Sequence, residues 1–123
     1  MKPEVRFHIR DRGQHTELAI GPGKVALLEA IEQTGSITSS AKKLGMSYRR
    51  AWLLVEETNR CFVRPAVQTV AGGQRGGGSS LTPVGVEFVR RYRALEQQTG
   101  LAVTRKLKSL LRTIPRQPGL RSR

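Results

Sequence analysis

The chain has 123 residues, of which 22 are lysine or arginine and nine are aspartate or glutamate, so its formal net charge is +13 and its isoelectric point is near 11.4. This length suits one domain with a modest core, and the positive excess favours a polyanionic partner, with nucleic acid first and an acidic membrane surface second. No apolar run reaches the length of a membrane span and no signal-peptide core is present, so we expect a cytoplasmic protein with no membrane partner.

Metal, disulfide and enzyme chemistry have little support in the sequence. Cys61 is the only cysteine, so it can form no internal disulfide and no cysteine-based zinc site, and we expect it to be a small buried hydrophobe. The two histidines, His8 and His15, fall in a predicted strand and beside a turn, where they are expected to be solvated. Since no carboxylate cluster, Cys-His pair or metal-binding set is present, we predict a non-enzyme without metal or cofactor.

The N-terminal residues predict a strand. Val5, Phe7 and Ile9 alternate with polar residues, which is the period of a strand with one apolar face. A turn is expected at residues 11–14, and residues 16–20 form either a short return strand or an extended lead-in to the next element.

A helix is predicted between the glycine-proline break at residues 21–23 and the glycine at Gly35. Its apolar residues recur every three or four positions, whereas Glu29 and Glu32 are expected to face solvent. The apolar face consists of Val25, Leu27, Leu28 and Ile31.

The stretch SITSSAKKLGMSYRRAWLLVEE (36–57) predicts two short helices joined by a tight turn. Ser36 and Ser47 are each placed to cap one helix, and Gly45 lies where the chain leaves the first helix, since glycine adopts left-handed φ/ψ at least cost. This pattern is typical of a helix-turn-helix, as the second and third helices of a three-helix unit, and we expect the third helix to continue to about Phe62. The inner faces consist of Ile37, Ala41 and Leu44 in one helix and of Ala51, Leu54 and Val55 in the other.

The outward residues at the start of the third helix are basic or aromatic. In a helix-turn-helix this end enters the DNA major groove, where arginine suits a bidentate contact with guanine. The alternative is an ordinary helical hairpin with a solvated charged face. We predict that base readout is carried by Tyr48, Arg49 and Trp52 with help from Ser47, and that phosphates are held by Arg50, Lys42, Lys43 and Arg75.

A glycine-rich segment separates two short strands. Residues 66–70 alternate and are rich in β-branched residues, the glycines follow at 72–78, and a short strand is expected at 80–82. A Walker-type phosphate loop would need a lysine that is missing here, so a hairpin fits better: the wing of a winged helix, with Arg75 at its tip reaching the minor groove or a phosphate. The alternative for the tip itself is a solvent loop.

Thr82-Pro83 is a helix-start signal, a capping hydroxyl followed by proline. Apolar residues then space out helically to about Ile114, and a helix of that length would span about 45 Å, with Gly100 expected to kink or divide it. The outer half must bury its apolar stripe, and a symmetry-related copy is the simplest partner. No acid follows Thr99, and the last residues, 115–123, are predicted to form a disordered basic tail. We therefore predict a mostly α fold with a small β wing: a winged helix-turn-helix with an N-terminal strand or hairpin and a long C-terminal dimerisation helix.

Two segments, TGSITSSAKKLGMSYRRAWLLVEETN (34–59) and GGQRGGGSSLTPVG (72–85), together with the apolar helix that follows, carry a family resemblance. They resemble the DNA-binding domain of ModE-type, molybdate-responsive bacterial transcription regulators, which is related to the LysR-type winged helix, and the resemblance covers residues 4–98. It implies a homodimer held by the N-terminal strands and the long helix, bound to a palindromic operator on double-stranded DNA. In full-length members a separate C-terminal oxyanion-binding region senses molybdate.

Beyond Leu101 this chain departs from that pattern. Only 22 residues remain, too few for even one small β-barrel, and they are basic. We therefore expect a single-domain member without the molybdate-binding region, which works constitutively, senses another effector or relies on a separate effector-sensing partner chain. The expected division is a winged helix-turn-helix domain at 1–98, a continuation of the dimerisation helix at 99–114 and the basic tail at 115–123.

Two functions from different classes remain for a basic chain of this kind. The first is a dimeric, sequence-specific transcription regulator, with a connection to molybdenum-related genes that follows from the resemblance alone. The second is a non-specific architectural protein of the nucleoid type, which would bind DNA through its charge and its basic tail.

Overall fold

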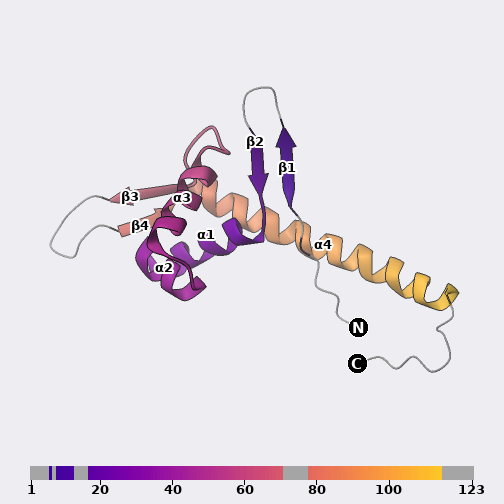
Figure 1. The fold of residues 1–123 in the computed structure, drawn as a ribbon. Helices are drawn as coiled ribbons and strands as arrows, with labels where there is room; N and C mark the ends of the chain where they lie inside the picture. Colours follow the sequence, from indigo (N-terminus) through magenta and orange to yellow (C-terminus); the bar gives the residue numbers. More distant parts are fainter. Residues whose placement is uncertain (1–5, 7, 13–16, 71–77, 115–123) are drawn as a thin grey trace.

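The computed structural model describes residue 6 and residues 8–12, 17–70 and 78–114 of the chain. A three-helix unit lies between two hairpins, and one long helix extends away from it (Figure 1). This is the predicted fold class, mostly helical with a small β wing. The elements in chain order are β1 (Ile9–Arg12), β2 (Glu17–Ile20), α1 (Pro22–Thr34), α2 (Ile37–Leu44), α3 (Tyr48–Asn59), β3 (Val67–Val70), β4 (Gly78–Leu81) and α4 (Pro83–Thr113).

The three-helix unit packs as the apolar pattern predicts. The expected inner face of α1 is fully buried, and Ala41 of α2 and Ala51 of α3 are buried with it. Because alanine is small, two helices can approach each other closely where such residues face inward. The buried residues form one core together with Ala66, Val67, Val89 and Tyr92 from the following elements.

Both hairpins are antiparallel and form separate two-stranded sheets. In the first, Ile9 pairs with Ile20, so the residues after the first turn form the return strand rather than an extended lead-in. In the second, Val67 pairs with Leu81. The predicted apolar residues Val5 and Phe7 lie outside the described residues.

The second hairpin, which we call the wing (β3 and β4), is attached to the helical unit at its base. The side-chain Oδ1 of Asn59 accepts hydrogen bonds from the backbone N–H groups of Ala66 and Val67 at 2.9 and 3.0 Å, and its Nδ2 donates to the carbonyl of Val67 at 3.2 Å. From the other strand, the N–H of Ser79 donates to the carbonyl of Gly35 at 2.9 Å. The wing is therefore tied both to the end of α3 and to the turn between α1 and α2.

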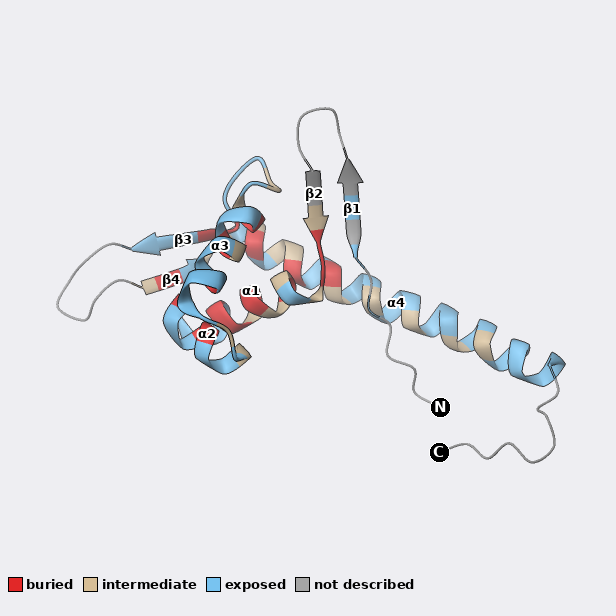
Figure 2. Ribbon diagram, in the orientation of Figure 1, coloured by how far each residue is buried: buried red, intermediate tan, exposed pale blue. Residues whose placement is uncertain are grey.

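The long helix α4 begins at the predicted signal and runs without a break through Gly100. The hydroxyl of Thr82 accepts a hydrogen bond from the N–H of Gly85 at 3.2 Å and so caps the helix. The expectation that Gly100 divides the helix is wrong. One glycine costs a helix only about 1 kcal/mol, and the residues on both sides of Gly100 continue the same helix. The buried residues of α4 are Gly85, Val89 and Tyr92, and no described residue after Tyr92 is buried (Figure 2).

The end of α3 differs from the prediction. The helix stops at Asn59 instead of continuing to about Phe62, because the chain must turn there for the Asn59 amide to reach β3. The ring of Phe62 still packs, but it does so from the loop, edge-on against Phe88 with ring centroids 4.9 Å apart.

Two further expectations about single side chains need correction. Cys61 is half-buried rather than buried, and its Sγ contacts the carbonyl of Glu57 at 3.3 Å. Glu29 was expected to face solvent, yet it is an ion-pair partner of Arg93 from α4. Long charged side chains cover part of the surface between α1 and α4, which a helical period alone does not reveal.

Candidate nucleic-acid interface

The turn between α2 and α3 determines how α3 is presented. Gly45 has φ of 70°, which favours glycine, and its N–H donates to the carbonyl of Lys42 at 3.2 Å. The hydroxyl of Ser47 then accepts the backbone N–H of Arg50 at 3.1 Å and caps α3. The equivalent cap on α2 is Ser36, which accepts the N–H of Ser39 at 3.1 Å. The predicted capping residues therefore set both helices of the helix-turn-helix.

The helix α3 has a buried face and an open face. Its buried residues are Ala51, Val55 and Thr58. On the open face, the side chain of Tyr48 is 55% exposed and that of Trp52 is 44% exposed, although both are large and aromatic. Two exposed arginines lie beside them. We call this group, Tyr48, Arg49, Arg50 and Trp52, the leading face of α3.

The leading face is positively charged and is not neutralised locally. The first turn of α3 contains no acidic residue, and the first carboxylate along the helix belongs to Glu56. Within the part of the chain that the structure describes, neither Arg49 nor Arg50 makes an ion pair. The partial positive charge at a helix N-terminus adds to theirs, so this end of α3 suits an anionic partner.

Several acidic residues elsewhere are paired with cations outside the leading face. Glu57 lies 3.3 Å from the ammonium of Lys24, and Glu87 accepts hydrogen bonds from Arg91 at 2.8 Å and Arg90 at 2.6 Å. The hydrogen bond from Arg91 and the charge of Arg90 lower the pKa of the Glu87 carboxyl below its usual value. These pairs involve no residue of the leading face.

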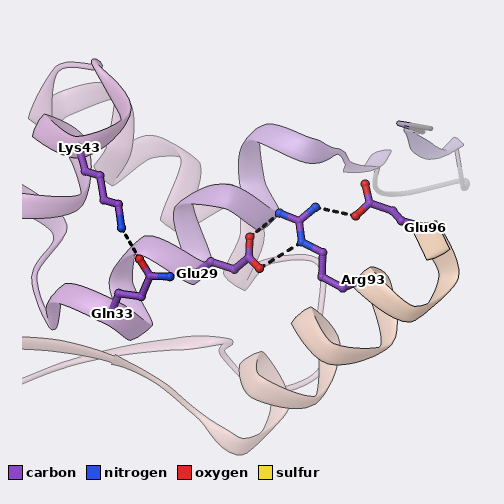
Figure 3. Close-up of polar contacts among 5 residues, drawn as sticks. All are labelled: Glu29, Gln33, Lys43, Arg93 and Glu96. Carbon is purple, nitrogen blue, oxygen red and sulfur yellow. Dashed lines mark hydrogen bonds and ion pairs between the residues drawn. The ribbon is translucent and has the colours of Figure 1, made fainter. Parts of the chain in front are cut away.

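The predicted phosphate ligands lie close to the leading face where the structure describes them. Lys42 and Lys43 occupy the last turn of α2 and are both exposed, but the ammonium of Lys43 donates to Gln33 Oε1 of α1 (Figure 3). The Ser47 hydroxyl accepts the hydrogen bond from the Arg50 N–H that caps α3, and its own proton can still be donated to another acceptor. Arg75 lies outside the described residues.

Sequence patterns do not indicate the roles of two other residues. Asn59 has a polar side chain at the end of α3 with no local signal for a structural role, yet this side chain anchors the wing. Arg93 pairs with Glu96 three residues later, a spacing visible in the sequence, and also with Glu29, which is 64 residues away. No local signal predicts the contact between Arg93 and Glu29.

The described residues form no candidate metal-binding site. Among them, no group of three or more His, Cys, Asp or Glu side chains is arranged to hold a metal ion. Likewise, none of the helices that the structure describes combines the length and the apolar character needed to cross a membrane.

Comparison with known proteins places the chain in a family. No family model matches it. It is 41% identical over 83 residues to the molybdenum-pterin-binding protein MopB of Rhodobacter capsulatus, an alignment that covers 68% of this chain and 31% of the relative. It is 42% identical over 87 residues to the molybdenum transport protein ModE of Azotobacter vinelandii, covering 71% of this chain and 32% of the relative.

A third relative is named for DNA binding. The chain is 36% identical over 81 residues to the DNA-binding transcriptional dual regulator ModE of Escherichia coli K12, covering 66% of this chain and 31% of the relative. The names of these relatives describe regulation, transport and molybdenum-pterin binding rather than an enzyme, in agreement with the predicted absence of catalysis. The chain spans about a third of the length of the relatives it matches. Over the aligned residues the chain belongs to the family of ModE-type regulators, as its helix-turn-helix and wing motifs predicted.

Proposed function

We propose that this chain is a dimeric, sequence-specific DNA-binding transcription regulator whose α3 enters the major groove. The observation that carries the proposal is the exposure of Tyr48 and Trp52 next to two arginines that make no ion pair with any described residue, on a helix whose opposite face is buried. Burying such residues in the core would be favourable, so their exposure favours a binding surface over an ordinary helical hairpin. The names of the relatives, which describe transcriptional regulation, support the same function.

Within the proposal, some residues of the leading face and its neighbours contact bases and others contact phosphates. Arg49 forms a bidentate contact with a guanine, while Tyr48 and Trp52 contact bases or stack at the groove edge, with the Ser47 hydroxyl as an additional donor. Arg50, Lys42, Lys43 and Arg75 hold phosphates and fix the position of the protein on the duplex. Lys43 would exchange its contact with Gln33 for a phosphate, since both side chains are at the surface.

The proposed dimer is supported by the outer half of α4. From Val103 to the C-cap residue Ile114, the end of this helix carries apolar side chains on one side that nothing in the described chain covers. A two-fold related copy would bury this stripe and place two α3 helices on one side of the dimer, which suits a palindromic site. The exposed apolar residues on this side of the helix are Val103, Leu110, Leu111 and Ile114.

The genes that we propose as targets are those of molybdenum uptake and use. The support comes from the relatives, which are named for molybdenum transport and molybdenum-pterin binding. The described residues form helices and two-stranded hairpins and build no barrel of the kind expected for an oxyanion site. The proposal includes a separate effector-sensing partner chain.

The test is to select bound sequences from a random DNA pool and then to measure Arg49→Ala on the selected operator and on unrelated DNA. Loss of a bidentate base contact should weaken operator binding by roughly 1–3 kcal/mol and leave binding to unrelated DNA nearly unchanged. Arg112→Ala removes the same charge from the far end of α4 and should affect both DNAs equally and slightly. Equal losses on both DNAs for Arg49→Ala would remove Arg49 from base readout.

The second candidate is a non-specific architectural DNA-binding protein. It is favoured by one observation, the net charge of +13 with no acid after Thr99. In that case the selection should recover no sequence preferred by more than a few-fold, and removing residues 115–123 should abolish most binding. If the chain is a sequence-specific regulator, the selection should recover a strongly preferred sequence, and the truncation should weaken binding to all DNA sequences equally and only mildly.

A further inference from the structure

Arg93 links α4 to α1 through a three-residue ion-pair cluster, which we call the α1–α4 clamp (Glu29, Arg93 and Glu96). The Nε of Arg93 donates to Glu29 Oε2 at 3.1 Å, and its Nη2 donates to Glu29 Oε1, so both carboxylate oxygens are engaged. Its Nη1 donates to Glu96 Oε1 at 2.5 Å (Figure 3). A guanidinium held by two carboxylates in this manner has a fixed orientation, because its donors form a planar fork.

The clamp lies where α4 leaves the body of the molecule. The last buried residue of α4 is Tyr92, and no described residue beyond it is buried. Arg93 and Glu96 therefore make their contacts within about one turn of the end of the core, with side chains that are 40% and 13% exposed. They are positioned to restrain the direction in which the rest of the helix extends.

A small change of that direction has a large effect at the far end. From Arg93 to Thr113 the helix continues for 20 residues, or about 30 Å. A tilt of about 6–7° would displace its end by about 3.4 Å, which is the rise of one base pair. In a dimer joined through these outer halves, the same tilt changes the distance between the two α3 helices.

The helix α1, which carries Glu29 of the clamp, also contacts the helix-turn-helix. Gln33 lies one turn after Glu29 on α1, and its Oε1 accepts a hydrogen bond from Lys43 of α2. One side of α1 thus contacts α4 through Glu29 and α2 through Gln33 (Figure 3). The direction of α4 is set relative to the same helix that supports the DNA-binding pair.

We propose that Arg93 is a positioning residue that fixes the angle between α4 and the winged helix-turn-helix, and thereby sets the half-site spacing the dimer accepts. This inference rests on the proposed function, because spacing has a meaning only for a dimer on DNA. Arg93 touches no DNA in this role. It acts by limiting the geometries in which both α3 helices reach their half-sites.

The experiment measures dissociation constants of the purified chain for the selected operator and for versions with one or two base pairs added or removed between the half-sites. The unchanged chain should prefer the selected spacing by about tenfold or more over its neighbours, and Arg93→Met should reduce that preference to about threefold or less. Binding of a single half-site should be the same for both chains, a result that separates spacing from base readout.

Arg91→Met is the matched control. It removes the same charge two residues earlier on α4, where the partner of Arg91 among the described residues is Glu87 of the same helix at 2.8 Å, so it should keep the full spacing preference. Glu29→Gln breaks the clamp from α1 and should relax the spacing as Arg93→Met does, which decides the question if the arginine variant folds poorly.

The outcomes distinguish this inference from the function on which it rests. Retention of the full spacing preference by Glu29→Gln and Arg93→Met, with operator binding intact, would overturn the role of the clamp and leave the regulator standing. Absence of any sequence preference in the unchanged chain would overturn the regulator, and the clamp inference with it.

Discussion

The two halves of α4 have the same helical geometry but opposite surroundings. From Pro83 to Arg93 the helix packs against the core through Val89 and Tyr92 and is fixed by an ion pair to α1. From Glu96 to Thr113 it leaves the body, and most of its larger apolar side chains are exposed (Figure 2). The first half is held by its own chain, whereas the second half offers the same kind of apolar surface without a partner in the chain.

This difference teaches that helix formation and helix burial are separate requirements here. Local signals, a capped start and good helix formers, suffice to continue the helix beyond the core. Most of the stability of a helix in a protein comes from tertiary packing of its apolar face, so the outer half gains most from a second molecule. Changes in the inner half should therefore alter folding, and changes in the outer half should alter association.

The largest effect is expected for Gly85→Ala in the inner half. A Cβ at this position would lie 2.3 Å from the carbonyl oxygen of Ala66 and 3.1 Å from its carbonyl carbon, and backbone atoms cannot move aside as a flexible side chain can. We expect a loss of about 3 kcal/mol in the free energy of unfolding, despite the better helix propensity of alanine. Urea denaturation followed by circular dichroism measures this loss.

Gly23→Ala provides the control for that measurement. Gly23 is also helical, and a Cβ there would meet nothing within 4 Å, so the substitution should leave stability unchanged or raise it by up to about 1 kcal/mol. If the two alanine variants were equally stable, the contact between α4 and Ala66 would not limit the fold.

A smaller effect, confined to association, is expected for Leu110→Gln in the outer half. The side chain is 49% exposed in the single chain, and burying it in a dimer would contribute about 1–2 kcal/mol per copy. The dissociation constant of the dimer should rise by roughly tenfold or more, while the unfolding free energy changes by less than about 0.5 kcal/mol. Sedimentation equilibrium measures the first quantity and urea denaturation the second.

Leu101→Gln is the matched control for Leu110→Gln. Leu101 is 63% exposed and lies nine residues earlier, which is two and a half turns and therefore the opposite side of the helix. Its replacement should leave the dimer intact. Equal weakening by both variants would show that association does not use one defined side of α4.

Much of the fold was predictable because its signals are local. Ser36, Gly45 and Ser47 define the helix-turn-helix through contacts within four residues, and Thr82 with Pro83 defines the start of α4. The exposed residues at the start of α3 follow from the same helical period. The proposed DNA contacts of these residues remain predictions.

The remaining features depend on contacts between distant parts of the chain. The end of α3 is set by the reach of Asn59 to residues that follow a loop, and no period in the sequence indicates it. The partner of Glu29 is 64 residues away, so only the packing of α4 on α1 reveals that pair. Lys43 likewise lies near Gln33 only after the helices have packed.

The smallest effect concerns the pH dependence of the inner half. Burial raises the pKa of the Tyr92 phenol above its usual value of 10.0, and the nearby carboxylate of Glu96 adds to the rise. Since the folded state holds the phenol proton of Tyr92 more tightly than the unfolded state, the contribution of the protonated phenol to the free energy of unfolding is fully present below pH 10. It is lost as the pH rises from 10 through the raised pKa of the folded protein.

The measurement compares the thermal midpoint of the unchanged chain with that of Tyr92→Phe between pH 8 and about pH 12, the range that spans the phenol titration. The difference between the two should be constant below pH 10 and should shift in favour of the phenylalanine variant above it, because phenylalanine has no proton to lose. Tyr48→Phe, at the exposed start of α3, is the matched substitution that leaves Tyr92 in place. A pH dependence that survives in Tyr92→Phe would mean that the titrating group lies outside the inner half of α4. The two halves of α4 would then differ in packing but not in the pH dependence of their stability.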